Sequence, residues 1–265
     1  MMMHSFSTLG CPELDLDGVV ALAARHGFHT VELRALCGRL DLPALFTEQF
    51  GTPEKWADYL HSRRIRVCAL DTSFKLIGST EAERAELLEY VRWADGADVL
   101  WLRVLDGGTT GTPEEIDEAV ATMAWWREQR LKNFWAVDLL VEPYDALARQ
   151  ATLKQFLDRV PHATLLWDSH RMWRQGGEDP VSIWGLVKHR TAHIHVKDSV
   201  SQPSEKHPFT YVMPGEGEFP MRPLLDALKT DKFGGVLSLE WNRHWHPYLP
   251  ELDKALHSAA RTRWW

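Results

Sequence analysis

The sequence predicts one α/β domain with the architecture of a (β/α)8 barrel, the TIM barrel, over residues 1–265. Short apolar runs alternate with helical patterns along almost the whole chain, and eight of these runs have the character of strands. The interval between them is nearly constant. From Glu32, at the end of the second run, to Glu240, at the end of the eighth, the chain advances 208 residues in six steps. This is about 35 residues per unit, as parallel strands joined by helices require.

The eight expected strands share an apolar, β-branched or aromatic composition. They are Ser5–Leu9, Thr30–Leu33, Arg66–Leu70, Val99–Leu105, Phe134–Glu142, Thr164–Asp168, Ala192–Val196 and Gly235–Glu240. Helix starts between them are marked by a cap residue followed by proline, or by a capping box. These signals stand at Thr52-Pro53, Thr80 with Glu83, Thr112-Pro113 with Glu115, and Asp179-Pro180.

Two absences favour a closed barrel over an open sheet of two halves. No G-x-G-x-x-G motif follows the first strand, where Leu9-Gly10-Cys11-Pro12 stands. The sequence therefore lacks the main motif that would indicate a dinucleotide-binding sheet. No linker rich in Gly, Ser or Pro divides the chain. Eight units in roughly 250 residues match the size of a (β/α)8 barrel.

Composition excludes several classes of partner. The net charge is −7 and there is no basic block, which argues against nucleic acid, because phosphate binding depends on clustered cations. No run of eighteen apolar residues predicts a membrane span, and the N-terminus lacks the pattern of a signal peptide. Cys11, Cys37 and Cys68 form no C-x-x-C pair, so we expect buried thiols in a reducing compartment. Together these features predict a cytoplasmic protein.

Polar residues end four consecutive expected strands. They are Glu142, Asp168, His195 and Glu240. In a barrel of this type the C-terminal strand ends hold the chemistry. A single acid at a strand end is more often a helix cap, and a lone histidine is more often structural, but four such residues on neighbouring strands favour a shared metal site. Three carboxylates and one imidazole suit oxygen-preferring divalent ions such as Mg²⁺ or Mn²⁺.

Further residues at this rim have two interpretations each. Lys197 could contact a substrate oxygen or donate a proton, or it could pair with Asp198 or Asp168. Arg103 could bind a phosphate or carboxylate, or form an internal salt bridge. Three tryptophans follow the sixth and eighth strands and could wall a sugar pocket with flat apolar faces. They are Trp173, Trp241 and Trp245.

Several stretches together resemble the xylose-isomerase-like barrel superfamily of sugar isomerases, 3-epimerases and inosose dehydratases. They are "GFHTVELR" with Glu32, "VEP" with Glu142, "WDSH" with Asp168, "HIHVKD" with His195 and Lys197, "MPGEGEFPMRPLLDAL" around Gly215-Glu216-Gly217, and "SLEW" with Glu240. The resemblance covers nearly the whole chain, and the H-x-K-D and G-E-G stretches are its most specific parts.

The resemblance implies a bound divalent ion, with Mn²⁺, Mg²⁺, Co²⁺ and Zn²⁺ all open. Its implied ligands are Glu142, Asp168, His195 and Glu240. In epimerases of the group, the two matching glutamates also lie on opposite faces of the substrate and exchange its proton. The resemblance also places Glu32 near the substrate, and His170 as a substrate contact or second ligand, although His170 follows Asp168 by two residues where relatives often have three.

The chemistry expected from these residues is proton abstraction next to a carbonyl. A carboxylate acts as the base, and a metal stabilises the resulting enediolate as a Lewis acid. Glu142, Glu240 and Lys197 are the expected catalytic residues. Return of the proton to the neighbouring carbon gives an isomerase, return to the same carbon an epimerase, and loss of a hydroxyl an inosose or keto-polyol dehydratase. The expected substrate is a sugar, a sugar phosphate or a polyol.

Two rival functions remain. A DNA-repair endonuclease with this barrel needs additional histidines, but Leu33, Leu70 and Asp71 stand in the strand-end neighbourhoods, and the net charge is unsuited to DNA. A non-catalytic sugar-binding barrel is the second rival, since fold alone does not fix function. A homo-oligomer is left open, with Arg263-Trp264-Trp265 either at a subunit contact or disordered.

Overall fold

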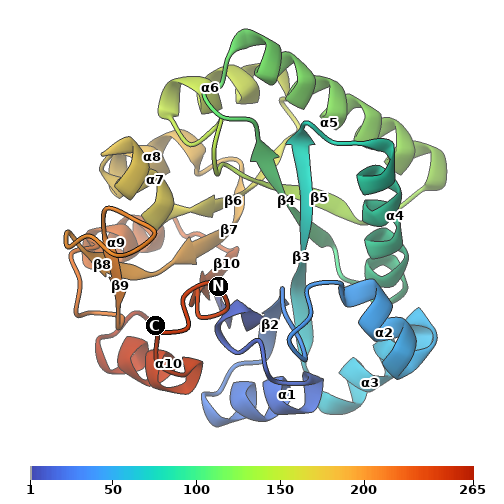
Figure 1. Cartoon of the computed structure of the whole chain (residues 1–265), viewed down its shortest axis with the longest axis horizontal. Helices are drawn as coiled ribbons and strands as arrows, with labels where there is room; N and C mark the ends of the chain where they lie inside the picture. Colours follow the sequence, from blue (N-terminus) through green and yellow to red (C-terminus); the bar gives the residue numbers. More distant parts are fainter. Residues whose placement is uncertain (1) are drawn as a thin grey trace.

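The computed structural model describes residues 2–265, and its central feature is a barrel of eight parallel strands surrounded by helices (Figure 1). The strands run in the order β1-β10-β7-β6-β5-β4-β3-β2. A parallel bridge between Ser7 and Glu32 joins the two ends of this order and closes the barrel. The strands are β1 (Met3–Phe6), β2 (Thr30–Leu33), β3 (Arg66–Ile77), β4 (Trp101–Gly107), β5 (Asp138–Glu142), β6 (Thr164–Asp168), β7 (Thr191–Val196) and β10 (Val236–Leu239).

The four helix starts expected from cap signals are present, and the outer layer consists of helices. They are α1 (Leu16–Arg25), α2 (Leu42–Phe50), α3 (Pro53–Arg63), α4 (Glu81–Gly96), α5 (Pro113–Asn133), α6 (Gln150–Arg159), α7 (Ser169–Gly176), α8 (Pro180–Val187), α9 (Met221–Thr230) and α10 (Leu252–Arg261). Thr80 and Thr112 form capping boxes with Glu83 and Glu115, and Thr52 and Asp179 cap helices that begin with proline. The (β/α)8 prediction is confirmed.

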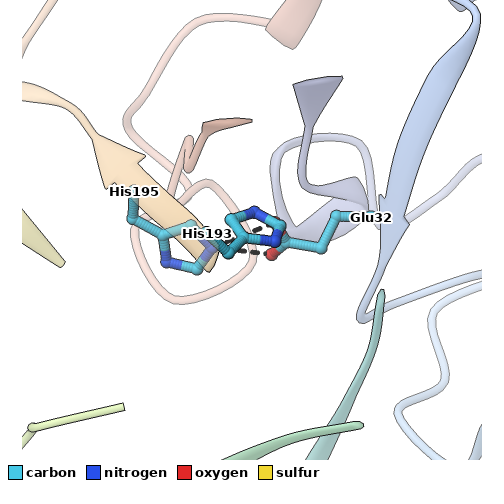
Figure 2. Close-up of side chains that lie close together, drawn as sticks. All are labelled: Glu32, His193 and His195. Carbon is cyan, nitrogen blue, oxygen red and sulfur yellow. Dashed lines mark hydrogen bonds and ion pairs between the residues drawn. The ribbon is translucent and has the colours of Figure 1, made fainter. Parts of the chain in front are cut away.

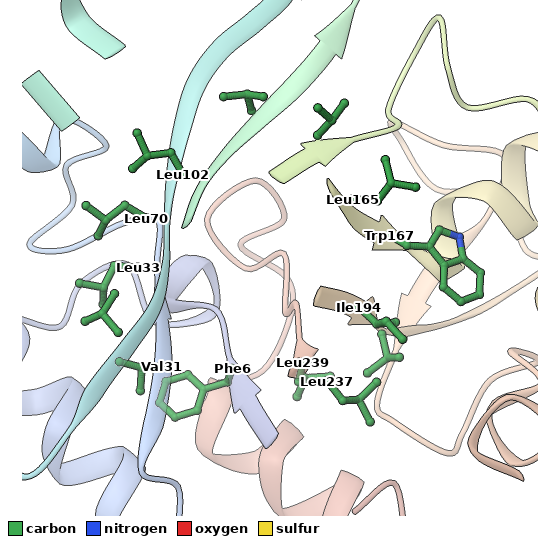
Figure 3. Packing of buried hydrophobic residues seen from close by; sticks show 14 of the residues in the cluster. Phe6, Val31, Leu33, Leu70, Leu102, Leu165, Trp167, Ile194, Leu237 and Leu239 are labelled. Atoms are coloured by element: carbon green, nitrogen blue, oxygen red, sulfur yellow. The ribbon is translucent and has the colours of Figure 1, made fainter. Parts of the chain in front are cut away.

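Alternation along each strand separates the barrel interior from the helix-facing layer. Outward residues such as Leu165 and Trp167 on β6 belong to the large core between strands and helices, part of which is drawn in Figure 3. The residues between them face inward. Ala69, Leu140 and Leu166 form a small separate apolar cluster, and the next inward residue on each of their strands is an acid. Each of these three strands therefore places an apolar residue below an acid at the barrel mouth.

Six of the eight expected strands have different bounds, and three of these differ by more than two residues at one end. The first ends at Phe6, because the Ser7 hydroxyl accepts a hydrogen bond from Leu9 N and starts a 3-10 turn, Thr8–Gly10. The fifth begins only at Asp138, since Phe134 adopts the left-handed conformation that ends α5. The third continues to Ile77, past the expected Leu70. A hairpin of β8 (Asp198–Val200) and β9 (Thr210–Val212) was not expected.

The G-E-G stretch anchors this hairpin loop. The Asp198 carboxylate accepts hydrogen bonds from the backbone N–H groups of Ser199, Gly215, Gly217 and Phe219. Four donors on one carboxylate fix the segment that follows β9 against the end of β7. Asp198 is therefore occupied by backbone and does not pair with Lys197.

The two C-terminal tryptophans pack against their own chain. Trp264 is buried, and Trp265 packs edge-on against Phe28 of its own chain, with ring centroids 5.3 Å apart. All three cysteines are free thiols, but Cys37 is exposed and not buried as expected, because it lies in a surface turn with φ of 52°. Within residues 2–265, no helix combines the length and apolarity needed to cross a bilayer.

We predict that Gly217→Ala destabilises the fold by about 1–3 kcal/mol, because a Cβ there would overlap the Asp198 carboxylate and break its anchoring bonds. Gly185→Ala is the matched control, since its Cβ meets nothing within 4 Å and lies within α8, where alanine stabilises by about 0.5–1 kcal/mol. Urea denaturation of both variants measures the difference. Equal unfolding midpoints for the two variants would contradict the anchor role.

Candidate metal centre

Three of the four expected metal ligands meet at the barrel mouth. Asp168 lies beside His195 in the register of β6 and β7, and Glu142 ends β5. One possible ligand atom from each of Glu142, Asp168 and His195 lies within 4.8 Å of the other two, and all three residues are buried. This cluster could hold an ion.

The fourth expected ligand, Glu240, lies beside this cluster. Its Oε1 is 3.6 Å from Nδ1 of His195, and its Oε2 contacts the ammonium group of Lys197. Lys197 Nζ also lies 2.7 Å from Asp168 Oδ2, so one buried cation links two of the expected ligands. Burial favours a higher pKa for Glu240, but Lys197 and His195 outweigh it and hold that pKa at about 2.

His195 is oriented by Glu32, which reaches from β2 across the interior to β7 (Figure 2). His195 Nε2 lies 2.8 Å from Glu32 Oε1, and Nε2 of His193, two residues deeper, lies 2.7 Å from Glu32 Oε2. Burial alone would raise the pKa of Glu32, but the two imidazoles hold it well below its usual range. Burial alone would lower the pKa of His195, but Glu32 and Glu240 raise it to about 10.

Glu142 has a different electrostatic environment from Glu240. Burial raises the pKa of Glu142 to about 7, although the Arg103 guanidinium, with Nε 3.2 Å from Glu142 Oε2, favours the charged form. Arg103 also lies 3.5 Å from Asp71 and donates to the carbonyl of Thr72. The internal-salt-bridge interpretation of Arg103 is thus realised, and the side chain lines the cavity as well.

A cavity of about 370 Å³ opens above these residues, within the range of small-molecule sites. Glu142, Glu240, Lys197 and Arg103 line it, as does Trp245. The loop after β5 supplies Tyr144 and Asp145. This loop is fixed by Asp106 at the end of β4, whose carboxylate accepts hydrogen bonds from three backbone N–H groups, those of Tyr144, Asp145 and Leu147.

Four residues expected to bind substrate lie away from this cavity. Glu32 is fully buried behind His195. His170 is buried in aromatic rings and bonded through Nε2 to Ser199 Oγ at 2.7 Å. Trp173 packs between His170 and Phe219 under the Arg174 guanidinium, and Trp241 is buried with Nε1 donating to Pro250 O. The last three contact other parts of the protein, because α7 positions His170 and Trp173 and the loop after β10 positions Trp241.

The structure also brings residues to the cavity that the sequence did not single out. They include Arg34, Lys75, Tyr144, Arg171, Lys206, Tyr211 and Asn242. Arg34 follows β2 directly in "VELR", so its place after a strand end was a usable signal. Lys206 and Tyr211 come from the β8–β9 hairpin, which no periodicity revealed. His246, in the loop after β10, also lines the cavity.

The donor set fits a divalent ion. His195 Nδ1 is buried without a hydrogen-bond partner among residues 2–265, while the Nε2 side of the ring is held by a carboxylate. This is how proteins orient a metal-binding imidazole. The carboxylates of Glu142 and Asp168 supply the oxygen atoms that Mg²⁺ and Mn²⁺ prefer.

Fold and site together define a class of proteins: (β/α)8 barrels with a carboxylate–histidine centre at the C-terminal strand ends. The chain matches the model of the xylose isomerase-like TIM barrel family over residues 20–263, and it belongs to that family. A comparison with curated proteins finds no match.

Solved structures share this fold at low sequence identity. The probable 3-DHS dehydratase AsbF of Bacillus anthracis is 17% identical, with a TM-score of 0.79, over 98% of this chain and 99% of its own. The IolI protein with a bound zinc atom is 16% identical, with a TM-score of 0.75, over 99% and 96%. A D-tagatose 3-epimerase-like protein is 15% identical, with a TM-score of 0.71, over 99% and 96%. At these identities the similarity establishes the fold.

We predict that Lys197→Met destabilises the metal-free protein by about 3–5 kcal/mol, because it leaves Asp168 and Glu240 buried without their cation. Lys75→Met is the matched control, since this lysine is exposed and its loss changes stability by less than about 0.5 kcal/mol. Urea denaturation in the presence of a chelator measures both variants. If Lys197→Met unfolds like the control, the carboxylates do not depend on Lys197.

Proposed function

We propose that the protein is a divalent-metal-dependent isomerase or epimerase of a sugar, sugar phosphate or polyol. The observation that carries the proposal is the pair of buried carboxylates, Glu142 and Glu240, which line one cavity beside a group of metal-capable side chains. Membership of the xylose isomerase-like family and the fold shared with an epimerase-like protein support it.

Four residues would hold the ion: Glu142, Asp168, His195 and Glu240. When bound, the ion supplies positive charge to the oxygen that becomes negative as the carbonyl enolises. Glu32 holds the His195 ring with Nδ1 free for the ion, and Lys197 holds Asp168 and Glu240 in place. The identity of the ion, among Mn²⁺, Mg²⁺, Co²⁺ and Zn²⁺, is set by coordination and availability.

The carboxylates carry the proton. One of Glu142 and Glu240 removes the proton from the carbon next to the carbonyl, and the electron pair of that C–H bond moves toward the carbonyl oxygen. A carboxylic acid then returns a proton, either to the adjacent carbon or to the opposite face of the same carbon. Lys197, which lines the cavity, donates a hydrogen bond to a substrate oxygen.

A dehydratase acting on an inosose or keto-polyol is the second candidate, favoured by the fold shared with a probable dehydratase. The same base would remove the proton, and a hydroxyl on the next carbon would leave as water. A panel of ketoses and inososes in D2O separates the outcomes. An isomerase or epimerase incorporates deuterium at carbon and its product retains all the oxygen atoms of the substrate, whereas a dehydratase forms a product that is lighter by one water molecule.

We predict that Glu142→Gln lowers deuterium incorporation by about 10²–10⁴-fold, because an amide cannot accept the proton. Mass spectrometry of substrate incubated with metal-loaded protein measures the rate. Glu89→Gln, at an exposed position on α4, serves as the control and retains the wild-type rate. Full incorporation by Glu142→Gln with metal still bound would remove Glu142 from the proton transfer.

We also predict that Mn²⁺ stabilises the protein, by about 2.7 kcal/mol at a hundredfold excess over its Kd. Glu32→Gln weakens Mn²⁺ binding by about 10–100-fold, since the amide no longer fixes the charge and orientation of His195. Thermal denaturation with and without Mn²⁺, with exposed Glu48→Gln as control, measures both effects. No shift with any divalent ion favours the non-catalytic sugar-binding barrel.

A further inference from the structure

The cavity carries more positive than negative side chains, although the whole chain has a net charge of −7. Among its lining residues, Glu142, Asp145 and Glu240 are acidic. The basic side chains are Arg34, Lys75, Arg103, Arg171, Lys197 and Lys206. A basic cavity in an acidic protein concentrates anions.

Half of these cations are already neutralised by the protein. Arg103 pairs with Glu142, Lys197 contacts Asp168 and Glu240, and Arg171 lies 3.3 Å from Asp145. The other three are Arg34, Lys75 and Lys206, and none has a carboxylate within ion-pairing distance in residues 2–265. Lys206 donates to the carbonyl of Trp245, a neutral partner.

Arg34 is the member of this set whose charge is buried, with a relative exposure of 6%. Its hydrogen bonds go to neutral acceptors: one Nη donates to the carbonyl of Asp71 at 3.4 Å, and the other to Ser73 Oγ at 2.8 Å. The Asp71 carboxyl group instead faces Arg103. A buried guanidinium without a counter-ion is costly, and its remaining donors match the two oxygens of an oxyanion.

We propose that the substrate carries a carboxylate or phosphate group, bound by Arg34 at the side of the cavity formed by the loop after β2 and the C-terminal half of β3. Exposed Lys75 and Lys206 add positive charge at the rim and attract the same group. This inference rests on the proposed function, because it takes the cavity over Glu142 and Glu240 as the substrate site. It restricts the substrate class to sugar acids and sugar phosphates.

The test compares matched anionic and neutral probes on the full-length, Mn²⁺-loaded protein. D-gluconate against D-glucitol tests a carboxylate, and D-ribulose 5-phosphate against D-ribulose tests a phosphate. Isothermal titration calorimetry gives each Kd. We expect one anionic probe to bind at least about tenfold more tightly than its neutral counterpart, a difference of about 1.4 kcal/mol. The pair that shows the difference identifies the group.

Arg34→Gln removes the charge and should abolish this preference. Arg39→Gln is the matched control, since Arg39 is close in sequence, half-buried, and paired with Glu48 outside the cavity. If Arg34→Gln does not fold, the double variant Lys75→Gln/Lys206→Gln, at exposed positions, should still lower anion affinity by about two- to fivefold at low salt.

Two results overturn the inference: equal affinity for both members of each pair, or an anion preference that Arg34→Gln retains, which would place the anion on the metal. Deuterium incorporation separates this failure from failure of the proposed function. Exchange into neutral ketoses without anion preference leaves the function standing and removes the inference. Anion preference without exchange on any substrate supports the inference and removes the function.

Discussion

Several charged side chains at the barrel mouth are buried, and each of these lies beside an opposite charge on another strand. Lys197 from the end of β7 holds Asp168 of β6 and Glu240 after β10, Arg103 of β4 holds Glu142 of β5, and His195 is held by Glu32 of β2. A buried charge without such a partner costs several kcal/mol. The pairs therefore constrain the strand ends, and they keep oxygen and nitrogen donors within reach of one another.

This arrangement depends on the barrel below it. Because side chains alternate across each strand, every second residue faces inward, and the parallel register brings Asp168 level with His195. One level deeper, Ala69, Leu140 and Leu166 share the interior with the buried pair of Glu32 and His193. Burial strengthens each ion pair, and the pKa values of Glu142 and Glu240 differ because Lys197 and His195 act on Glu240 whereas Arg103 acts on Glu142.

Two further carboxylates act on the loops around the cavity. Asp106 holds the segment that carries Tyr144, and Asp198 holds the segment after the β8–β9 hairpin. Each accepts several backbone N–H groups, so loops without regular hydrogen bonding are fixed around the cavity. The hairpin itself brings Lys206 and Tyr211 over the metal-capable residues. The strand ends supply one wall of the site, and these anchored loops supply the other.

The sequence by itself determined the fold and the four strand-end residues, because period and strand endings are local signals. Helix caps at Thr80 and Thr112 and strands such as Thr30–Leu33 were therefore predicted from neighbouring residues alone. Side-chain partners were decided only by the tertiary structure. Glu32 and His195 are 163 residues apart, and nothing local indicates that the barrel turns Glu32 toward His193 and His195 and away from the cavity. Neighbouring residues also give no indication that Arg34 lacks a carboxylate partner, because that depends on the positions of all the strand ends around the cavity.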